Sequence, residues 1–360
     1  MKHSQIAKSL LNNGTKMFHV TNRGYAKESL VAQYKQYGNV RDVLKMETVQ
    51  LSDLQPNQVL VKMLAAPVNP ADLNMIQGNY GKKAESFPAV GGNEGVGVIE
   101  EVGSAVTNLK VNQRVIPAKS GFGTWRTYAV ASESDLIQVP DDIPVEFSSV
   151  LSVNPMTAYR LLNDFADLKE GDVVVQNAPN SAVGLCVIQL AKQRGIRTIN
   201  ILRSPRPDQD TAIERLKELG GTIVVTDQYA SSANMRELVS DLPKAKLGLN
   251  ATGGEGGRAV ARFLGEDAQF VTYGGMSRQP ITLPTSPFIF NNITARGFWL
   301  TKWSEKANVE ERKKLLHELS NMFRDKKLVM LIKNERFSEL PYVLPTIEEP
   351  FREKKVVLKF

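Results

Sequence analysis

The clearest pattern of apolar and polar positions lies at residues 173–206. Three consecutive valines, residues 173–175, predict a buried strand of a parallel sheet. The turn-forming stretch NAPNSAVG follows, and apolar residues then recur at three- and four-residue spacing from Val183 to Ala191, which predicts a helix. Residues 198–202 predict a second strand. This succession is typical of the start of a dinucleotide-binding unit, whose helix N-terminus suits a pyrophosphate.

The turn itself is an imperfect dinucleotide motif. The usual fingerprint is G-x-G-x-x-G, and only Gly184 stands in a matching place. An ordinary strand–helix–strand unit with a tight loop therefore remains an alternative at this point.

The pattern on either side of this unit divides the chain into two halves. Before residue 142 the short apolar runs are β-branched and separated by glycine-rich turns, which predicts a β-rich half. After residue 147 strands alternate with helices, which predicts a doubly wound parallel sheet of six strands. The strands expected in the first half are 59–64, 89–102, a strand within 103–115, 121–130 and 136–140.

The later elements follow from the same periodicity. Residues 148–162 predict a linking helix broken by Pro155, and the C-terminal VVLKF is expected to pair with the first half. The remaining helices are expected at 208–219, 234–240, 258–264 and 310–324, and the remaining strands at 222–226, 247–251, 269–273 and 293–300.

Charge changes the picture mainly at the N-terminus. The formal net charge is +7, but five of the 45 Lys and Arg lie in residues 1–27, which contain no acid. An acid-free basic leader with interspersed apolar residues predicts a mitochondrial transit peptide, here residues 1–24; a disordered basic tail is the alternative. The rest is nearly balanced in charge, which argues against nucleic acid as a partner, and no apolar run is long enough to predict a membrane span.

Cysteine and histidine usage argues against a metal centre. The chain has one cysteine, Cys186, and three histidines, of which two lie in the N-terminal leader. One thiolate cannot form an internal disulfide or a Cys-rich zinc site. We expect Cys186 to be a buried packing residue on a helix.

Several motifs, taken together, resemble those of one enzyme family. They are PVNPADLNMIQGNYG, PAVGGNEGVGVIEEVGS, GTWRTYAV, SVNPMTAYRLL, VVVQNAPNSAVG, RTINILR, VTYGGMSRQP and RGFWLTKW. The layout resembles the medium-chain dehydrogenase/reductase superfamily, and the motifs resemble its mitochondrial trans-2-enoyl-thioester (enoyl-CoA/enoyl-ACP) reductases. Zinc-dependent relatives carry a histidine where this chain has Asn93, so the resemblance also implies a zinc-free site.

The resemblance implies the fold and its divisions. These are a mitochondrial transit peptide at 1–24, a GroES-like β-rich catalytic domain at 25–150, a Rossmann NADPH-binding domain at 151–303, and a segment at 304–360 that returns to the catalytic domain. The fold class is α/β. The enzymes it resembles are homodimers, and RGFWL is a candidate edge strand for pairing across a two-fold axis.

The implied reaction is NADPH-dependent reduction of an enoyl thioester in mitochondrial fatty-acid synthesis. Hydride is added to the β-carbon, and the α-carbon then receives a proton. Tyr80 matches the family's proposed proton donor, and a neutral phenol can donate at physiological pH; packing is the alternative role. Trp125 could support the site or fill the core, and Phe288 and Phe290 could line an acyl pocket or be core.

The end of the second strand indicates the choice of cofactor. Leu202 is followed by RSPR, with no acid before Asp208, so Arg203 and Arg206 favour a 2′-phosphate and hence NADPH over NADH. The family pattern is R-x-R, one residue shorter, so Arg203 is the clear match and Arg206 the open one. The alternative is that both arginine side chains are simply solvated at the surface and bind no phosphate.

The resemblance implies further contacts with NADPH. Asn154 matches a cofactor-contacting residue, with a helix cap as its alternative role. The other implied contacts are Asn180, Ser181, Ala182, Val183, Tyr273, Gly274, Gly275, Met276, Phe298, Trp299, Leu300 and Lys355, the last of which could simply be solvated. The alternatives to this function are an NADPH-dependent quinone or enone reductase and a non-catalytic NADPH-responsive binding protein.

Overall fold

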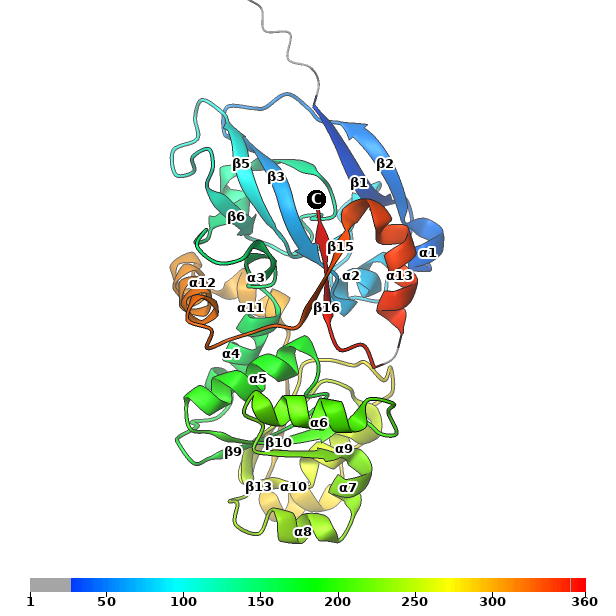
Figure 1. Ribbon diagram of the computed structural model, residues 1–360, viewed down its shortest axis with the longest axis vertical. Coiled ribbons are helices and arrows are strands. Elements are labelled where there is room, and N and C mark those ends of the chain that lie inside the picture. Colours follow the sequence, from blue (N-terminus) through cyan, green and yellow to red (C-terminus); the bar gives the residue numbers. More distant parts are fainter. Residues whose placement is uncertain (1–26, 350) are drawn as a thin grey trace, which may run out of the picture.

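The computed structural model describes residues 27–349 and 351–360, so the expected leader at 1–24 lies outside the described residues. The molecule is elongated, with a β-rich upper part and an α/β lower part (Figure 1). The C-terminus lies in the upper part, beside strands from the beginning of the chain.

The upper part contains two sheets. A three-stranded antiparallel sheet packs beside a larger one, in which long-range pairing joins the two ends of the chain. The small sheet has the order β2 (Lys45–Gln50), β1 (Glu28–Tyr34), β4 (Ala89–Val90); the large one has the order β15 (Ile332–Arg336), β16 (Lys355–Lys359), β3 (Gln58–Pro67), β5 (Val96–Val102), β6 (Arg114–Pro117), β8 (Leu136–Gln138), with β7 (Tyr128–Ser132) also paired to β3.

The lower part is built on the expected six-stranded parallel sheet. Its strands run in the order β11 (Ile223–Thr226), β10 (Arg197–Leu202), β9 (Val173–Asn177), β12 (Ala245–Asn250), β13 (Leu264–Thr272), β14 (Thr294–Gly297). Side chains alternate between the two faces of a strand, so Val174 packs into one core and Val173 and Val175 into another. Both faces are therefore covered, as a parallel sheet requires.

Helices cover these two faces. The core around Val174 includes α4 (Asn154–Asp164), α5 (Ala182–Gln193) and α12 (Val309–Arg324), and the core around Val175 includes α8 (Asn234–Leu238) and α9 (Gly254–Ala261). The other helices are α1 (Val40–Val43), α2 (Pro70–Ile76), α3 (Val145–Ser149), α6 (Gln209–Glu218), α7 (Asp227–Ser231), α10 (Thr285–Asn291), α11 (Leu300–Lys306) and α13 (Leu340–Glu348). No helix of the described residues is long and apolar enough to cross a membrane.

The C-terminal strand does pair with the first half of the chain. β16 runs antiparallel to β3, with Leu358 opposite Ala66, and parallel to β15. Its residues 356–358 are buried, so this strand is an interior member of the large sheet.

Several expected elements were wrong in detail. Pro155 does not break a helix; it occupies the first turn of α4, where its missing N–H costs nothing, and α3 ends before it. The strand expected at 89–102 is two strands, because residues 91–95 form a buried loop. Only residues 128–130 of the hairpin and strand expected at 121–130 lie in a strand, the start of β7. The strand expected at 293–300 ends at Gly297, and α9 starts four residues earlier than expected, at Gly254.

The structure also shows the surroundings of four residues whose packing was considered from the sequence. Trp125 is fully buried, and its indole nitrogen donates to the carbonyl of Pro67 at 3.3 Å, so it is core. Cys186 is buried in α5, as expected. The core alternative for Phe288 and Phe290 was wrong, since they are 40% and 77% exposed; neither lines the main cavity.

Candidate active site

A cavity of about 1860 Å³ lies where the loops of the two parts meet. Its walls come from α2 and the loop after it, the start of α4, the turn before α5, the ends of β10, β13 and β14, and the segment that leads into β16. Every candidate site residue predicted from the sequence lines it: Tyr80, Asn154, Asn180, Ser181, Ala182, Val183, Arg203, Arg206, Tyr273, Gly274, Gly275, Met276, Phe298, Trp299, Leu300 and Lys355.

The turn before α5 forms part of the wall of this cavity. Ser181 is the N-cap, and its hydroxyl accepts from the backbone N–H of Gly184 at 3.1 Å. A Cβ on Gly184 would lie 2.6 Å from the carbonyl oxygen of Ala178 and 2.7 Å from Cα of Pro179. The one glycine of the motif is therefore required by the close approach of helix and turn. Ala178 takes the left-handed conformation, φ 47°, which glycine usually adopts in such a bend.

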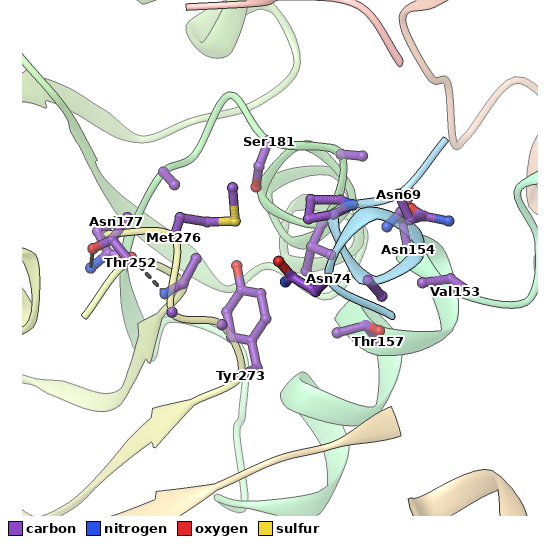
Figure 2. A pocket seen from close by; sticks show the side chains of 18 of the residues that line it. Asn69, Asn74, Val153, Asn154, Thr157, Asn177, Ser181, Thr252, Tyr273 and Met276 are labelled. Atoms are coloured by element: carbon purple, nitrogen blue, oxygen red, sulfur yellow. Dashed lines mark hydrogen bonds between the residues drawn. The ribbon is translucent and has the colours of Figure 1, made fainter. Parts of the chain in front are cut away.

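Asn177 holds the carboxyl ends of two neighbouring strands together. Its side-chain amide donates to Asn250 Oδ1 at 2.7 Å and to Thr252 Oγ1 at 2.9 Å, and its Oδ1 accepts from the backbone N–H of Ala251 at 2.7 Å. Figure 2 shows Asn177 and Thr252 on one side of the cavity. This edge is where open parallel sheets bind ligands.

The two arginines after β10 have different partners. Arg206 forms a two-pronged pair with Asp208, with both N–O distances 2.6 Å, and this hydrogen bonding lowers the pKa of Asp208 to about 2. Arg203 makes no ion pair with any described residue; its guanidinium lies 4.4 Å from the ring centre of Phe351. Arg203 therefore has its donors free for an anion, whereas those of Arg206 facing Asp208 are occupied.

Among the residues expected to contact NADPH, two have a buried polar atom that lacks a hydrogen-bond partner in the described part of the chain. These atoms are Oδ1 of Asn154 and the hydroxyl of Tyr273, and burial raises the pKa of that hydroxyl. Figure 2 shows both side chains on the cavity wall. Asn154 does not act as a helix cap, since it is the first residue within α4 and Val153 precedes it as N-cap. Unpaired buried polar atoms are costly, so these two atoms are candidates for contact with a ligand.

Tyr80 stands on the loop after α2 and contacts the far side of the cavity. Its hydroxyl oxygen accepts a hydrogen bond from the indole N–H of Trp299 at 2.8 Å, and the rings meet edge to face with centres 5.8 Å apart. A Cβ on Gly81 would lie 3.0 Å from the Trp299 ring. Because the phenol oxygen accepts from Trp299, its own O–H remains available to donate.

A buried polar network lies behind the cavity wall. Glu94, 1% exposed, accepts from the backbone N–H of Val153 at 2.7 Å, from Ser152 Oγ at 3.2 Å and from Asn69 Nδ2 at 2.9 Å. The other end of the Asn69 amide, Oδ1, accepts from the ammonium of Lys355. Burial raises the pKa of Glu94 and lowers that of Lys355.

Comparisons with known proteins agree with this geometry. Residues 55–141 match the alcohol dehydrogenase GroES-like domain, and residues 182–320 match the zinc-binding dehydrogenase family. The mitochondrial enoyl-[acyl-carrier-protein] reductase of Dictyostelium discoideum is 48% identical over 89% of this chain and 92% of the relative. The enzyme of the same description from Homo sapiens is 46% identical over 81% and 78%. The solved Etr1p/NADP/crotonyl-CoA complex is 32% identical, with a TM-score of 0.86, and the match covers 93% of this chain and 100% of that one.

The chain belongs to the mitochondrial enoyl-[acyl-carrier-protein] reductase family. The resemblance drawn from the motifs is confirmed, and so are the α/β fold with a GroES-like part and a parallel six-stranded sheet. The domain boundaries and the role of each site residue stay predictions.

Asn93 has a structural role in this member of the enoyl reductase family. Its amide donates to Asp72 at 2.7 Å, and its Oδ1 accepts from Ser120 Oγ at 2.8 Å and from the backbone N–H of Gly121 at 2.7 Å. Both ends of its side-chain amide are therefore engaged by described residues. Within residues 27–349 and 351–360, no group of three or more His, Cys, Asp or Glu side chains could hold a metal ion.

Sequence reasoning missed the buried network of this enoyl reductase. Asn69, Asp72 and Glu94 lie within motifs used for the resemblance, but nothing was inferred from their chemistry. One signal was available, because an acid between glycines in the apolar run AVGGNEGVGVI is placed for burial, and a buried acid needs specific partners. Phe351 gave no signal, since its contact with Arg203 depends on the path of the C-terminal segment.

Proposed function

We propose that this protein is a mitochondrial NADPH-dependent reductase of trans-2-enoyl thioesters, acting in fatty-acid synthesis. The observation that carries the proposal is the placement of the Tyr80 hydroxyl, held by Trp299, on the same cavity as the turn before α5. The relatives described as mitochondrial enoyl-[acyl-carrier-protein] reductases and the Etr1p complex with NADP and crotonyl-CoA support the same activity.

The residues present fit NADPH. The backbone N–H groups at the start of α5 suit a pyrophosphate, and the unpaired Arg203 suits the 2′-phosphate. Asn154 and Tyr273 offer unpaired polar atoms along the wall, and Lys355 supplies a cation. When bound, NADPH supplies the hydride that adds to the β-carbon of the substrate.

Tyr80 performs the proton chemistry in this proposal. Negative charge develops on the thioester oxygen of the substrate as the β-carbon is reduced, and the α-carbon then needs a proton. The phenol can supply that proton, because its oxygen is held by the indole of Trp299 while its O–H faces no other described acceptor. The side chains around it provide hydrogen bonds where a zinc-dependent relative would use a metal ion.

We also propose that the protein forms a homodimer through β14. This strand is at the edge of the six-stranded sheet, and all four of its residues are exposed. The nearby helix α10 exposes Ile289 and Phe290, at 67% and 77%. An unpaired edge with apolar neighbours is suited to pairing with a second copy. The Etr1p/Etr2p heterodimer from Candida tropicalis, 31% identical, supports assembly in pairs.

The deciding experiment measures NADPH oxidation with crotonyl-CoA and, separately, with a quinone. The proposal expects turnover of the thioester, loss of roughly a hundredfold or more in kcat for Tyr80→Phe, and unchanged NADPH affinity in that variant. Turnover of quinone alone would favour the quinone reductase alternative, which has a structural relative at 26% identity in Bacillus thuringiensis. A Tyr80→Phe variant as fast as the parent would refute the proton-donor role.

A further inference from the structure

Glu94 connects three segments that are far apart in the sequence. It receives hydrogen bonds from Ser152 and Val153 at the start of α4, and from Asn69 at the start of α2. Through Asn69 it reaches Lys355, the first residue of β16. The three side chains at the centre of this chain are nearly inaccessible to solvent: Glu94 is 1% exposed, Asn69 4% and Lys355 9%.

With Glu94 ionised and Lys355 protonated, the hydrogen bonds in this chain have one possible direction. The backbone N–H of Val153 can only donate, so the oxygen of Glu94 that faces it must accept. Since an ionised carboxylate accepts at both oxygens, the Asn69 amide turns its NH₂ toward Glu94 and its carbonyl toward Lys355. Lys355 can only donate, so it requires that carbonyl.

The ammonium of Lys355 depends on this hydrogen bond to Asn69. Its ammonium makes no ion pair with a described residue, and Asn69 Oδ1 is its only hydrogen-bond acceptor in the described chain. Burial lowers its pKa, while Glu94 and Asp72 act in the opposite direction. The orientation of the Asn69 amide therefore decides whether the buried ammonium has a partner, and an unpaired buried ammonium is strongly disfavoured.

We propose that Glu94 and Asn69 are positioning residues for NADPH, which act by fixing the polarity of a buried hydrogen-bond chain from the Val153 N–H to the Lys355 ammonium. The same carboxylate fixes the start of α4, where Asn154 follows Val153 directly, so two candidate cofactor contacts depend on it. The inference rests on the proposed function, because it takes Lys355 and Asn154 to contact NADPH.

Exchanging the carboxylate of Glu94 and the amide of Asn69 tests the direction of this hydrogen-bond chain. In Glu94→Gln one end of the side chain becomes an NH₂ group. If its carbonyl faces Val153, the NH₂ faces the NH₂ of Asn69, and turning Asn69 would present an NH₂ to Lys355. Every arrangement leaves two donors facing each other. In Asn69→Asp two carboxylates face each other instead. The double variant again places an acceptor opposite each donor of the chain, and it keeps the net charge of the parent.

The measurement is the dissociation constant for NADPH, by its fluorescence change on binding. We expect Glu94→Gln and Asn69→Asp each to raise it by roughly tenfold or more, and the double variant to return to within about threefold of the parent. Ser152→Ala is the matched control, because it removes one donor to the same carboxylate and leaves the direction of the chain intact. We expect it to change the constant by less than about threefold.

A second ligand separates positioning from a general effect on folding. Adenosine 2′,5′-bisphosphate presents a 2′-phosphate to the Arg203 end of the cavity and lacks the nicotinamide half. We expect the single variants to lower its affinity less than they lower that for NADPH, because it makes only part of the contacts that NADPH makes with the cavity. Equal losses for both ligands, or a lower melting temperature with unchanged NADPH affinity in the folded single variants, would overturn the positioning role.

The double variant keeps the test decisive if a single variant fails to fold. A double variant that folds and binds NADPH supports the proposed direction of the hydrogen-bond chain. One that stays unfolded, or binds NADPH as weakly as the single variants, refutes it. If the parent itself binds no NADPH, the proposed function fails and this inference fails with it. If the parent binds NADPH and reduces crotonyl-CoA but the exchange gives no recovery, this inference alone fails.

Discussion

The indole N–H of Trp299 donates to the hydroxyl oxygen of Tyr80 at 2.8 Å. The two residues are far apart in the sequence: Tyr80 follows α2 in the β-rich part, and Trp299 follows the last strand of the parallel sheet. The bond therefore ties the proposed proton donor to the part of the molecule that carries the dinucleotide turn. Its edge-to-face ring contact would survive loss of the N–H.

Trp299→Phe tests this tie. The phenyl ring retains an aromatic contact with Tyr80 but cannot donate a hydrogen bond. We expect kcat for crotonyl-CoA to fall by about fivefold, the value of one ordinary hydrogen bond, with NADPH affinity close to that of the parent. Steady-state kinetics and NADPH titration measure the two effects. An unchanged kcat would show that the bond does not orient Tyr80.

Arg203 and Arg206 should have separable roles. Arg203→Ala removes an unpaired guanidinium, so we expect the dissociation constant for NADPH to rise by about tenfold or more while that for NADH stays unchanged. Arg206→Ala instead leaves Asp208 without its partner, and we expect a loss of roughly 1–3 kcal/mol in unfolding free energy. Titration with both nucleotides and urea denaturation distinguish these outcomes. Equal loss of NADPH and NADH binding in Arg203→Ala would contradict the assignment.

NADPH affinity should fall in alkaline solution. Burial lowers the pKa of Lys355 to about 8; Arg352 acts in the same direction, and Glu94 and Asp72 oppose it. The protonated ammonium attracts the anionic cofactor, so its loss above about pH 8 raises the dissociation constant, by up to about tenfold per pH unit. Lys355→Arg does not titrate in this range and should show a flatter profile. Identical profiles for the two proteins would exclude Lys355 as the titrating group.

The glycine of the turn before α5 should be intolerant of even a methyl group. In Gly184→Ala the Cβ would lie 2.6 Å from a backbone oxygen, so we expect a loss of about 1–3 kcal/mol in unfolding free energy without cofactor. Gly275→Ala is the matched control, since nothing lies within 4 Å of its Cβ. Urea denaturation of both variants gives the comparison. Equal stabilities would mean that the turn moves freely away from the helix.

The proposed homodimer depends on the exposed apolar side chains beside β14. We expect Ile289→Glu with Phe290→Glu to shift the protein from dimer to monomer in sedimentation velocity. Tyr342→Glu provides the control, because Tyr342 is 81% exposed on α13, in the other part of the molecule. A monomeric parent, or a dimer that survives the double substitution, would place the interface elsewhere or remove it.

The parallel half of the fold was the most predictable from sequence, for a physical reason. Its strands are buried on both faces and alternate with helices, so the valines at 173–175 and the spacing from Val183 to Ala191 each specify one element. Strands such as β1, with its partners in the small sheet 12 to 57 residues away, depend on long-range pairing that local periodicity does not report. The glycine-rich start of α9 was missed because glycine disfavours helix and only packing stabilises it there.

The candidate site was predictable where chemistry and position coincide. Arg203 and Tyr80 were found because a basic turn after a strand and a loop tyrosine each suggest a role. The network of Glu94, Asn69 and Lys355 could not be found in this way, because it joins residues up to 286 positions apart. Only the folded chain shows which end of the Asn69 amide faces the ammonium.

The interior position of β16 has a consequence for how the protein is made. The large sheet cannot be completed until residues 355–359 have left the ribosome, although β3, their neighbour, is synthesised near the start. The Lys355 that anchors the buried hydrogen-bond chain arrives at the same moment. A prematurely terminated chain would thus lack both an interior strand of the sheet and a proposed cofactor contact, and would expose an apolar edge that protein quality control can recognise.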